Sequence, residues 1–252
     1  MLFYLINLIV VIIDFFEVMT LVFSSIIKRC FDTIFSVMVL VITLPLSIII
    51  IIFLLYEHKR FPILLQSRGL TLTNGKVKII KFRTLLENHE REVAEKKSEN
   101  IFYKPQLKKY VPPLSGWLRK TGLDELPQFL NVLTGKMSVV GPRPLSINDL
   151  NFLKEKYTDS YNKREQLTVK PGISGIWQLY GDRKKNVENL IELDSLYQSH
   201  HTFLTDIKII VFSTYLVVTA NNSDAIVNNT IKDTVPMKYL INAKTIGGQT
   251  KL

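Results

Sequence analysis

The feature that most constrains this chain is an uncharged apolar stretch with a proline at its centre. Residues 33–56 contain no charged residue and exceed the roughly 20 apolar residues that a bilayer-spanning helix needs. Pro45 removes a backbone hydrogen bond and clashes with the preceding turn, and Thr43 and Ser47 are placed to bond backbone groups there. Basic residues flank both ends, whereas a spanning helix has its basic excess on one side. The pattern favours a helix that enters, breaks and leaves by the same face, with a kinked spanning helix as the alternative.

Residues 1–27 form a second apolar stretch whose relation to a membrane the sequence leaves open. They lack the basic start and the small-residue cleavage site of a signal peptide. Asp14 and Glu17 share one helical face, and either would cost about 2.5–3.5 kcal/mol at the bilayer centre. An interfacial helix and a span whose acidic face packs against protein are both compatible with this pattern. If the stretch spans, Lys28 and Arg29 place its C-terminal end in the cytoplasm.

The net charge of +10 indicates an anionic partner. Nucleic acid is disfavoured, because the basic residues form no continuous stripe and no nucleic-acid-binding motif is present. A lipid surface is favoured, because Lys28, Arg29, Lys59 and Arg60 directly flank the second apolar stretch. The single cysteine, Cys30, excludes an intramolecular disulfide, and the four histidines offer no metal-binding spacing.

After residue 60 the pattern changes to the short mixed segments of a small α/β domain. Residues 77–82 have the composition of a strand, and residues 137–140 form a second, shorter one. Residues 85–98 form a charged helix or a mobile segment, and prolines make 99–113 a loop. Helical patterns cover residues 114–121, with Trp117 and Leu118 on one side, and residues 148–163, 187–200 and 206–219. We therefore expect a mainly helical fold with few short strands.

Residues 122–135 carry the most local information in this domain. Asp124 occupies a helix N-cap position, Pro127 is tolerated in a first turn, and Gly135 fits a C-terminal stop. Asp124 and Glu125 have two interpretations: acids that complement the helix dipole, or a nucleophile with a second acid that binds metal or acts as a base. An apolar stripe follows at spacings of three and four: Leu126, Phe129, Leu130 and Leu133.

Several basic residues are candidates for phosphate binding. Arg143 lies between two prolines that stiffen an extended turn, and a rigid guanidinium is a good phosphate clamp. The alternative is an arginine in a structural loop. Lys81 and Arg83 fall on one face at a strand end, and Arg119 lies five residues before Asp124; each is otherwise an ordinary surface base. No glycine-rich nucleotide loop and no Ser/His/Asp arrangement is present.

A series of short motifs runs through residues 28–219 in a fixed order. They are Lys28-Arg29-x-x-Asp32, Gln66-x-Arg68-Gly69, Lys81-Phe82-Arg83-Thr84, Leu118-Arg119, Leu123-Asp124-Glu125-Leu126-Pro127-Gln128, Asn131-Val132-Leu133, the run from Met137 to Pro144, the run from Lys170 to Gln178, and Asp194-x-x-Tyr197. Together they resemble the bacterial sugar transferases, monotopic phosphoglycosyl transferases that prime glycan assembly by making polyprenyl-diphosphate-linked sugars.

The resemblance implies a re-entrant membrane helix, an Asp-Glu dyad, Mg²⁺ and a two-step reaction. Asp124 would attack the β-phosphate of a UDP-sugar, release UMP and form a phosphosugar-aspartyl enzyme, which polyprenyl (undecaprenyl) phosphate would then attack. Glu125 would assist through metal or proton handling, so that both acids are candidate metal ligands. The candidate substrate-binding residues are Arg143, Arg119, Lys81, Arg83, Gln128 and Arg68.

Two features depart from the family pattern. Many members carry Ser-Pro at the helix break, whereas this chain has Leu44-Pro45, so support for the break must come from elsewhere. The first 27 residues are longer than the start of the smallest members and too short for the four-helix membrane region of the large ones. The role of residues 1–27 is therefore not implied by the resemblance.

These expectations divide the chain into four regions. They are a hydrophobic membrane segment (1–27), a re-entrant helix broken near Pro45 (28–60), a cytoplasmic catalytic domain with membrane-associated helices (61–219) and a C-terminal tail (220–252). We expect a protein of the inner membrane whose partners are a UDP-sugar, polyprenyl phosphate and membrane lipids, with a homodimer or downstream glycosyltransferases as further partners. The glycan would be an exopolysaccharide, capsule, O-antigen or glycoprotein glycan. The alternative is a non-catalytic membrane-tethered scaffold that binds nucleotide sugar or anionic lipid.

Overall fold

The computed structural model describes residues 2–86, 111–181, 186–218 and 237, with the backbone alone for 2–23 and 186. Three sequence predictions therefore fall wholly or largely outside the described residues. They concern the charged segment 85–98, the proline-rich loop 99–113 and the C-terminal tail 220–252.

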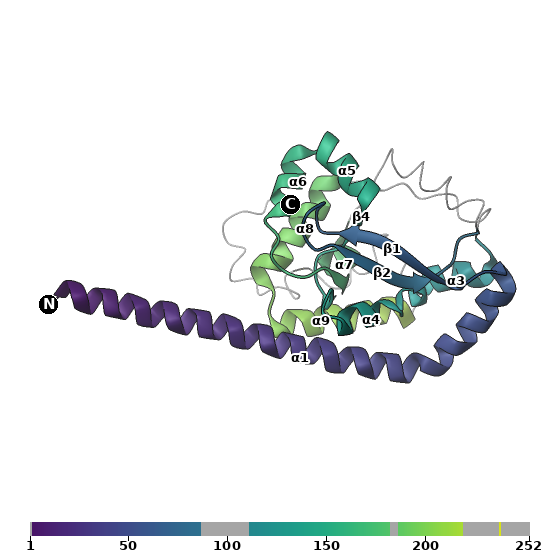
Figure 1. Ribbon diagram of the computed structural model, residues 1–252, viewed down its shortest axis with the longest axis horizontal. Coiled ribbons are helices and arrows are strands. Elements are labelled where there is room, and N and C mark those ends of the chain that lie inside the picture. The colour runs from purple at the N-terminus through teal and green to yellow at the C-terminus, as the bar shows by residue number, and fades with distance from the viewer. Residues whose placement is uncertain (1, 87–110, 182–185, 219–236, 238–252) are drawn as a thin grey trace.

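A single long helix, α1 (Leu2–His58), begins the chain and contains Pro45. The boundary predicted after residue 27 is therefore not a break in secondary structure. Helical geometry also continues through Pro45, so the predicted break takes the form of a bend: Figure 1 shows α1 passing along the domain and then turning toward α3. Thr43 Oγ1 donates to the carbonyl of Val39 (2.7 Å), one of the two side chains predicted to bond the backbone near the proline.

Two small sheets lie above α1. Strand β1 (Ile63–Gly69) is the centre of an antiparallel sheet with β2 (Val77–Phe82) and β4 (Leu145–Ser146), in the order β2-β1-β4. Strand β3 (Ser138–Val140) pairs in parallel with β5 (Gly172–Ser174). The strand predicted at residues 77–82 is confirmed, and that at 137–140 is one residue shorter than predicted. Strands β1, β4 and β5 were not predicted. Strands β4 and β5 are only two and three residues long, which is too short for an alternating pattern.

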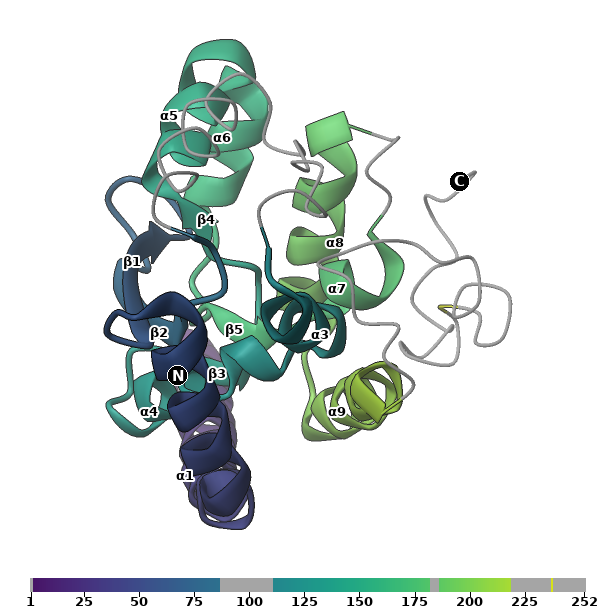
Figure 2. The same cartoon turned by 90° about the vertical axis from the view of Figure 1, so that its right-hand side faces the viewer.

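Helices surround these sheets (Figures 1 and 2). The helices predicted at 187–200 and 206–219 are confirmed, and the second begins three residues earlier than predicted. The helix predicted at 148–163 is instead two helices that meet at Tyr157. Trp117 and Leu118 do not share a side, because neighbouring helical residues diverge by about 100 degrees: Leu118 is fully buried and Trp117 is exposed. The helices are α3 (Pro113–Thr121), η2 (Leu123–Glu125), α4 (Gln128–Leu133), α5 (Ile147–Lys156), α6 (Thr158–Glu165), α7 (Ile176–Tyr180), α8 (Asn186–His200) and α9 (Phe203–Val218).

Two apolar clusters hold the fold together. The larger one joins β2, β3 and helices α5 to α9 through residues such as Leu150, Leu190 and Ile209. The smaller one joins the end of α1 to the domain, with Ile50 and Leu54 packed against Phe82 of β2 and Leu118 of α3. Each such buried side chain stabilises the fold by about 1.5–3 kcal/mol relative to exposure. We call the parts of α1 before and after Pro45 its N-terminal and C-terminal arms. The C-terminal arm is therefore an integral part of the domain.

Within Ser24–His58, α1 nevertheless presents many large apolar side chains to the outside. Among the described residues, Ser24–His58 is the stretch long and apolar enough to cross a membrane by length and composition, and 11% of its most apolar window is buried. Helices α4 and α9 lie on the same side of the molecule as α1 (Figure 2) and add further exposed apolar residues. An exposed apolar surface of this extent marks an interaction with lipid or protein. We call it the apolar face: it includes Val41, Ile42, Ile49, Ile52 and Phe53 of α1, Leu130 of α4, and Leu204, Val211 and Val218 of α9.

Candidate active site

The two candidate catalytic acids lie in η2, the single 3₁₀ turn between α3 and α4. The prediction that Asp124 caps a helix is wrong. Gly122, with φ 76°, ends α3 and begins η2 without a side-chain cap, and α4 starts only after Pro127. Capping is therefore not the role of Asp124, and only 8% of its surface is exposed.

The apolar stripe predicted around α4 faces the core only in part, since Leu126 and Phe129 pack against the core clusters. Gln128, Asn131 and Val132 are buried, whereas Leu130 is 43% exposed and belongs to the apolar face. The reason is a polar attachment to β2: Asn131 Oδ1 accepts from the Ile80 amide (2.9 Å), and Asn131 Nδ2 donates to the Lys78 carbonyl (2.8 Å). The predicted stop at Gly135 is confirmed, since α4 ends at Leu133 and Gly135 adopts φ 76°.

Lys81 lies at the centre of a charged cluster that includes both acids. The β1–β2 register pairs Lys81 with Leu64, which puts Lys81 and Arg68 on the same face of the sheet, because alternate residues and cross-strand partners share a face. Burial first, and then the charge of Arg68, lower the pKa of Lys81; Asp124 raises it, Arg119 lowers it and Glu125 raises it, and the resulting pKa is about 8. These mutual interactions bring five of the eight predicted site residues together.

Two of these bases have further partners that fix their positions. Arg119 lies on α3, and its Nη1 donates to Thr84 Oγ1 just beyond the end of β2 (3.3 Å). Arg68 donates from Nε and Nη2 to Gln66 Oε1 (3.2 and 3.0 Å) and from Nη1 to the Pro144 carbonyl (3.2 Å). The last contact joins the charged cluster to the turn that contains Arg143.

The backbone of Arg143 is held by a buried ion pair. Its amide donates to Asp194 Oδ1 (3.3 Å), and its carbonyl accepts from Arg164 Nη2. Arg164 is fully buried, forms an ion pair with Asp194 and also donates to the Leu70 carbonyl at the end of β1. Burial raises the pKa of Asp194, and the charge of Arg164 opposes that shift. No local pattern marks Arg164, which lies in a segment that reads as a polar, exposed helix.

The remaining predicted residues lie in different places. Gln128 is buried in the first turn of α4, 3% exposed. Arg83 follows the last residue of β2, and its Nε donates to the Phe61 carbonyl in the turn between α1 and β1 (3.1 Å). Its amide bonds the Pro62 carbonyl in the same turn (2.7 Å). The expected common face of Lys81 and Arg83 is thus interrupted, because the strand ends at Phe82.

Asp124 and Glu125 offer two adjacent carboxylates, which are too few to bind a metal ion by protein ligands alone. Within the described residues no three His, Cys, Asp or Glu side chains are grouped closely enough to hold an ion. Mg²⁺ commonly keeps several waters and is bound by one or two carboxylates together with substrate phosphates. The donor set of Asp124 and Glu125 therefore fits Mg²⁺ bound jointly with a phosphorylated substrate.

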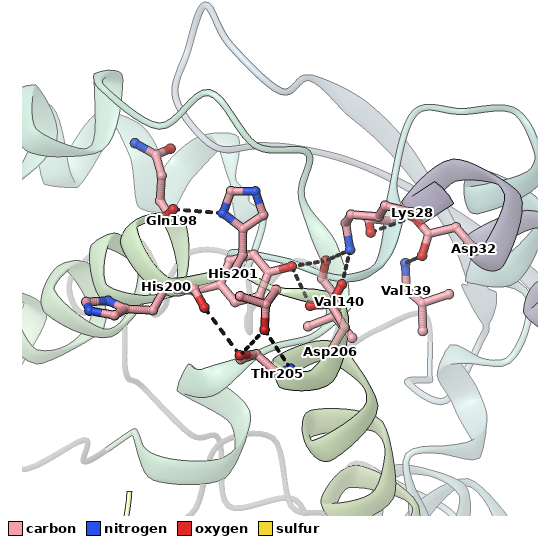
Figure 3. A network of polar contacts seen from close by, with 12 residues as sticks. Lys28, Asp32, Val139, Val140, Gln198, His200, His201, Thr205 and Asp206 are labelled. Carbon is pink, nitrogen blue, oxygen red and sulfur yellow. Dashed lines mark hydrogen bonds and ion pairs between the residues drawn. The ribbon is translucent and has the colours of Figure 1, made fainter. Parts of the chain in front are cut away.

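A second polar network attaches the N-terminal arm of α1 to the strand that precedes Arg143 (Figure 3). Lys28 forms an ion pair with Asp206 of α9 and donates to the Val140 carbonyl (3.4 Å). Asp32 accepts from Ser138 Oγ (2.7 Å) and from the Val139 amide (3.2 Å). Burial raises the pKa of Asp206, and Lys28 opposes that shift. Lys28 and Asp32 of the first family motif thus attach α1 to β3 and α9.

Comparison with known proteins agrees with this architecture. The family model described as bacterial sugar transferase matches residues 23–221. An undecaprenyl-phosphate galactose phosphotransferase of Salmonella typhimurium is 32% identical over 205 residues, 77% of this chain and 41% of that protein. Exopolysaccharide production protein ExoY of Sinorhizobium fredii is 32% identical over 203 residues, 74% of this chain and 83% of that protein.

A UDP-glucose:undecaprenyl-phosphate glucose-1-phosphate transferase of Klebsiella pneumoniae is 32% identical over 199 residues, 76% of this chain and 40% of that protein. The chain thus spans about two fifths of the Salmonella and Klebsiella relatives and most of the Sinorhizobium one. The family match covers far more than half of the chain and includes the dyad, the charged cluster and the Arg143 turn. This chain belongs to the bacterial sugar transferase family.

Proposed function

We propose that this protein transfers a sugar-1-phosphate from a UDP-sugar to polyprenyl phosphate, giving polyprenyl-diphosphate-sugar and UMP. The observation that carries the proposal is the grouping of Asp124 and Glu125 with the three bases Lys81, Arg68 and Arg119. Carboxylates form covalent phosphoryl intermediates, and several cations are needed to bind the pyrophosphate of a nucleotide sugar. The names of the relatives, which include galactose and glucose-1-phosphate transferases acting on undecaprenyl phosphate, support the same reaction class.

The proposed reaction uses Asp124 as the nucleophile. One carboxylate oxygen forms a bond to the β-phosphorus of the UDP-sugar while the bond between that phosphorus and the bridging oxygen breaks, and UMP leaves with the electron pair. An oxygen of polyprenyl phosphate then attacks the same phosphorus, and the Asp124 carboxylate leaves. Glu125 handles a proton or binds metal. Lys81, Arg68 and Arg119 neutralise the phosphate charge that develops in both steps.

Mg²⁺ fits this proposal as a cofactor. Asp124 and Glu125 would hold the ion together with phosphate oxygens of the substrate. A bound Mg²⁺ would supply further neutralisation of phosphate charge. The site residues themselves bind and orient the substrate and supply the nucleophile.

We also propose that α1 enters the membrane and leaves by the same side, with the catalytic domain in the cytoplasm at the inner membrane. Both arms of α1 contact the same domain, which supports this topology. In the N-terminal arm, Arg29 donates to the carbonyls of Val132 and Leu133 (2.6 and 2.8 Å). In the C-terminal arm, Ile50 and Leu54 pack in the smaller core cluster. Many of the exposed apolar residues of α1, from Ile34 to Ile49, lie between these two attachments.

Thiol labelling in intact cells tests this topology. The native Cys30 is exposed at the N-terminal arm, and Lys59, just after the end of α1, is exposed as well. A membrane-impermeant thiol reagent applied from outside should label neither Cys30 nor the introduced thiol of a Cys30→Ser, Lys59→Cys variant, and permeabilisation should expose both. Labelling of one position alone from outside would indicate a spanning helix and contradict the proposal.

UMP release tests the reaction itself. Purified protein with Mg²⁺, polyprenyl phosphate and a panel of UDP-sugars should release UMP, and Asp124→Asn should abolish this release. With a UDP-sugar labelled at the β-phosphate and no acceptor lipid, label should remain on the wild-type protein only. The matched control is Asp159→Asn, which changes an exposed acid of α6. Binding of UDP-sugar without UMP release across the panel would indicate a non-catalytic scaffold instead.

A further inference from the structure

A buried polar chain joins the last residues of α1 to helix α3. Ser115 of α3 is fully buried, and its hydroxyl donates to Glu57 Oε2 (2.6 Å). His58 Nε2 lies 2.9 Å from the same Ser115 oxygen and 3.4 Å from Glu57 Oε2. A hydroxyl has one hydrogen, and Ser115 gives it to the carboxylate. His58 must therefore carry a hydrogen on Nε2 and donate it to Ser115.

This order of donors excludes a serine nucleophile of the hydrolase type. In such a triad the histidine lies between serine and acid and accepts the serine proton. Here Ser115 lies in the middle and donates directly to Glu57, so His58 cannot act as its base. The three side chains form a structural connection between two helices, and the buried Ser115 oxygen satisfies both partners at once.

The connection lies one helical turn from a phosphate-binding candidate. Ser115 and Arg119 are four residues apart in α3, and residues at this spacing share a helix face. Between them Leu118 packs against Ile50 and Leu54 of α1. Arg119 in turn donates to Thr84 and belongs to the charged cluster around Lys81. Helix α3 thus carries the attachment to α1 and the Arg119 guanidinium on one short rigid segment.

We propose that Glu57, His58 and Ser115 are positioning residues that hold α3 against the end of α1 and thereby place Arg119 in the phosphate site. We call these three residues the latch. This inference rests on the proposed function, because it assigns Arg119 to phosphate binding. It makes the end of the long apolar helix contribute to substrate binding through α3 and Arg119.

The test compares a disruptive and a conservative variant at each of two positions. Ser115→Ala removes the central oxygen, whereas Ser115→Thr keeps it. His58→Leu removes the donor, whereas His58→Gln keeps an N–H near the position of Nε2. The two disruptive variants should raise the KM for UDP-sugar about tenfold, the effect of weakening one charged hydrogen bond, with little change in kcat. The conservative variants should stay near wild type. The control Ser160→Ala removes another buried helical hydroxyl, in α6.

A double-mutant cycle separates positioning from a general loss of stability. If Ser115 acts through Arg119, then Ser115→Ala should have no further effect on KM in an Arg119→Ala background. Additive effects of the two changes would overturn the proposal. So would a Ser115→Ala variant whose KM equals that of the wild type.

A second readout does not require turnover. Trp117 of α3 is 44% exposed and Trp177 is 2% exposed, so acrylamide quenching of tryptophan fluorescence reports mainly on α3. Ser115→Ala and His58→Leu should change the quenching constant, and Ser115→Thr, His58→Gln and Ser160→Ala should not. Unchanged quenching in the disruptive variants would overturn the latch even if the protein is active. If the wild-type protein never releases UMP, altered quenching in the two disruptive variants would still support the latch while the proposed function fails.

Discussion

Arg164 should be the most sensitive structural residue near the site, because it supports the Arg143 turn from inside the domain. The change Arg164→Met keeps most of the aliphatic stem and removes the guanidinium. Asp194, 2% exposed, then loses its ion-pair partner, and the Arg143 carbonyl loses a donor. Breaking a buried pair by removing one partner costs about 3–5 kcal/mol, since the other charge stays buried. At 2–4 °C per kcal/mol for a domain of this size, the melting temperature should fall by roughly 6–20 °C.

The loss should depend on pH with a defined sign. Burial raises the pKa of Asp194, and Arg164 is the main influence that opposes this shift. In Arg164→Met this main opposition is gone, so the pKa of Asp194 in the folded protein rises further above its value in the unfolded chain. A folded-state pKa above the unfolded value means that stability increases as the pH falls. The deficit relative to wild type should therefore be largest at neutral pH and shrink under acidic conditions.

The assay is thermal unfolding of the purified protein in detergent between pH 5 and pH 8. The control Lys163→Met removes an exposed charge from the same helix and should stay within about 0.5 kcal/mol of wild type. The double variant Arg164→Met, Asp194→Leu removes the unpaired carboxylate and should regain part of the stability at neutral pH, while UMP release stays low. A deficit in Arg164→Met that is below 1 °C, or equal at pH 5 and pH 8, would refute this reasoning.

Three further predictions concern the charged cluster and its supports. Because the pKa of Lys81 is about 8, Lys81 loses its charge above that pH, so the KM for UDP-sugar should rise between pH 7 and pH 9 in wild type and stay flat in Lys81→Arg. Asn131→Ala removes both side-chain bonds to the β2 backbone and should lower stability by about 2–3 kcal/mol in a thermal melt, with a raised KM as β2 loosens. Gly141→Ala puts a methyl group 2.3 Å from the Lys170 carbonyl oxygen, so this variant should fail to accumulate as folded protein in size-exclusion chromatography.

Local patterns predicted the elements whose signal is contained in neighbouring residues. The apolar run of α1 and the strand at 77–82 follow from composition and alternation. The helices near 187–200 and 206–219 follow from apolar residues at helical spacing, and their ends shifted by only a few residues. Patterns failed where a contact decided the outcome. Asp124 was expected to cap a helix, yet Gly122 ends α3 in a left-handed conformation and the chain makes a 3₁₀ turn.

Helix α4 also shows that a local pattern does not reveal what an apolar side chain contacts. Its leucines and Phe129 form the stripe that normally faces a core. In the structure its attachment to β2 is polar, through Asn131, and Leu130 joins the apolar face next to α1. A pattern of apolar residues reveals that a helix has an apolar side, but a lipid-facing side and a core-facing side look alike in the sequence.

What the sequence by itself determined is which candidate site residues the chain carries and the presence of the long apolar helix. The two adjacent acids, the arginine between two prolines and the uncharged stretch around Pro45 are visible as residue types in order. Only the tertiary structure decided which bases meet the acids, how the Arg143 turn is supported and where α1 is attached. Arg164 bonds Leu70 across 94 positions of sequence, and Ser115 bonds Glu57 across 58. Burial and partnership of a polar side chain depend on packing between distant segments, and no local pattern contains that information.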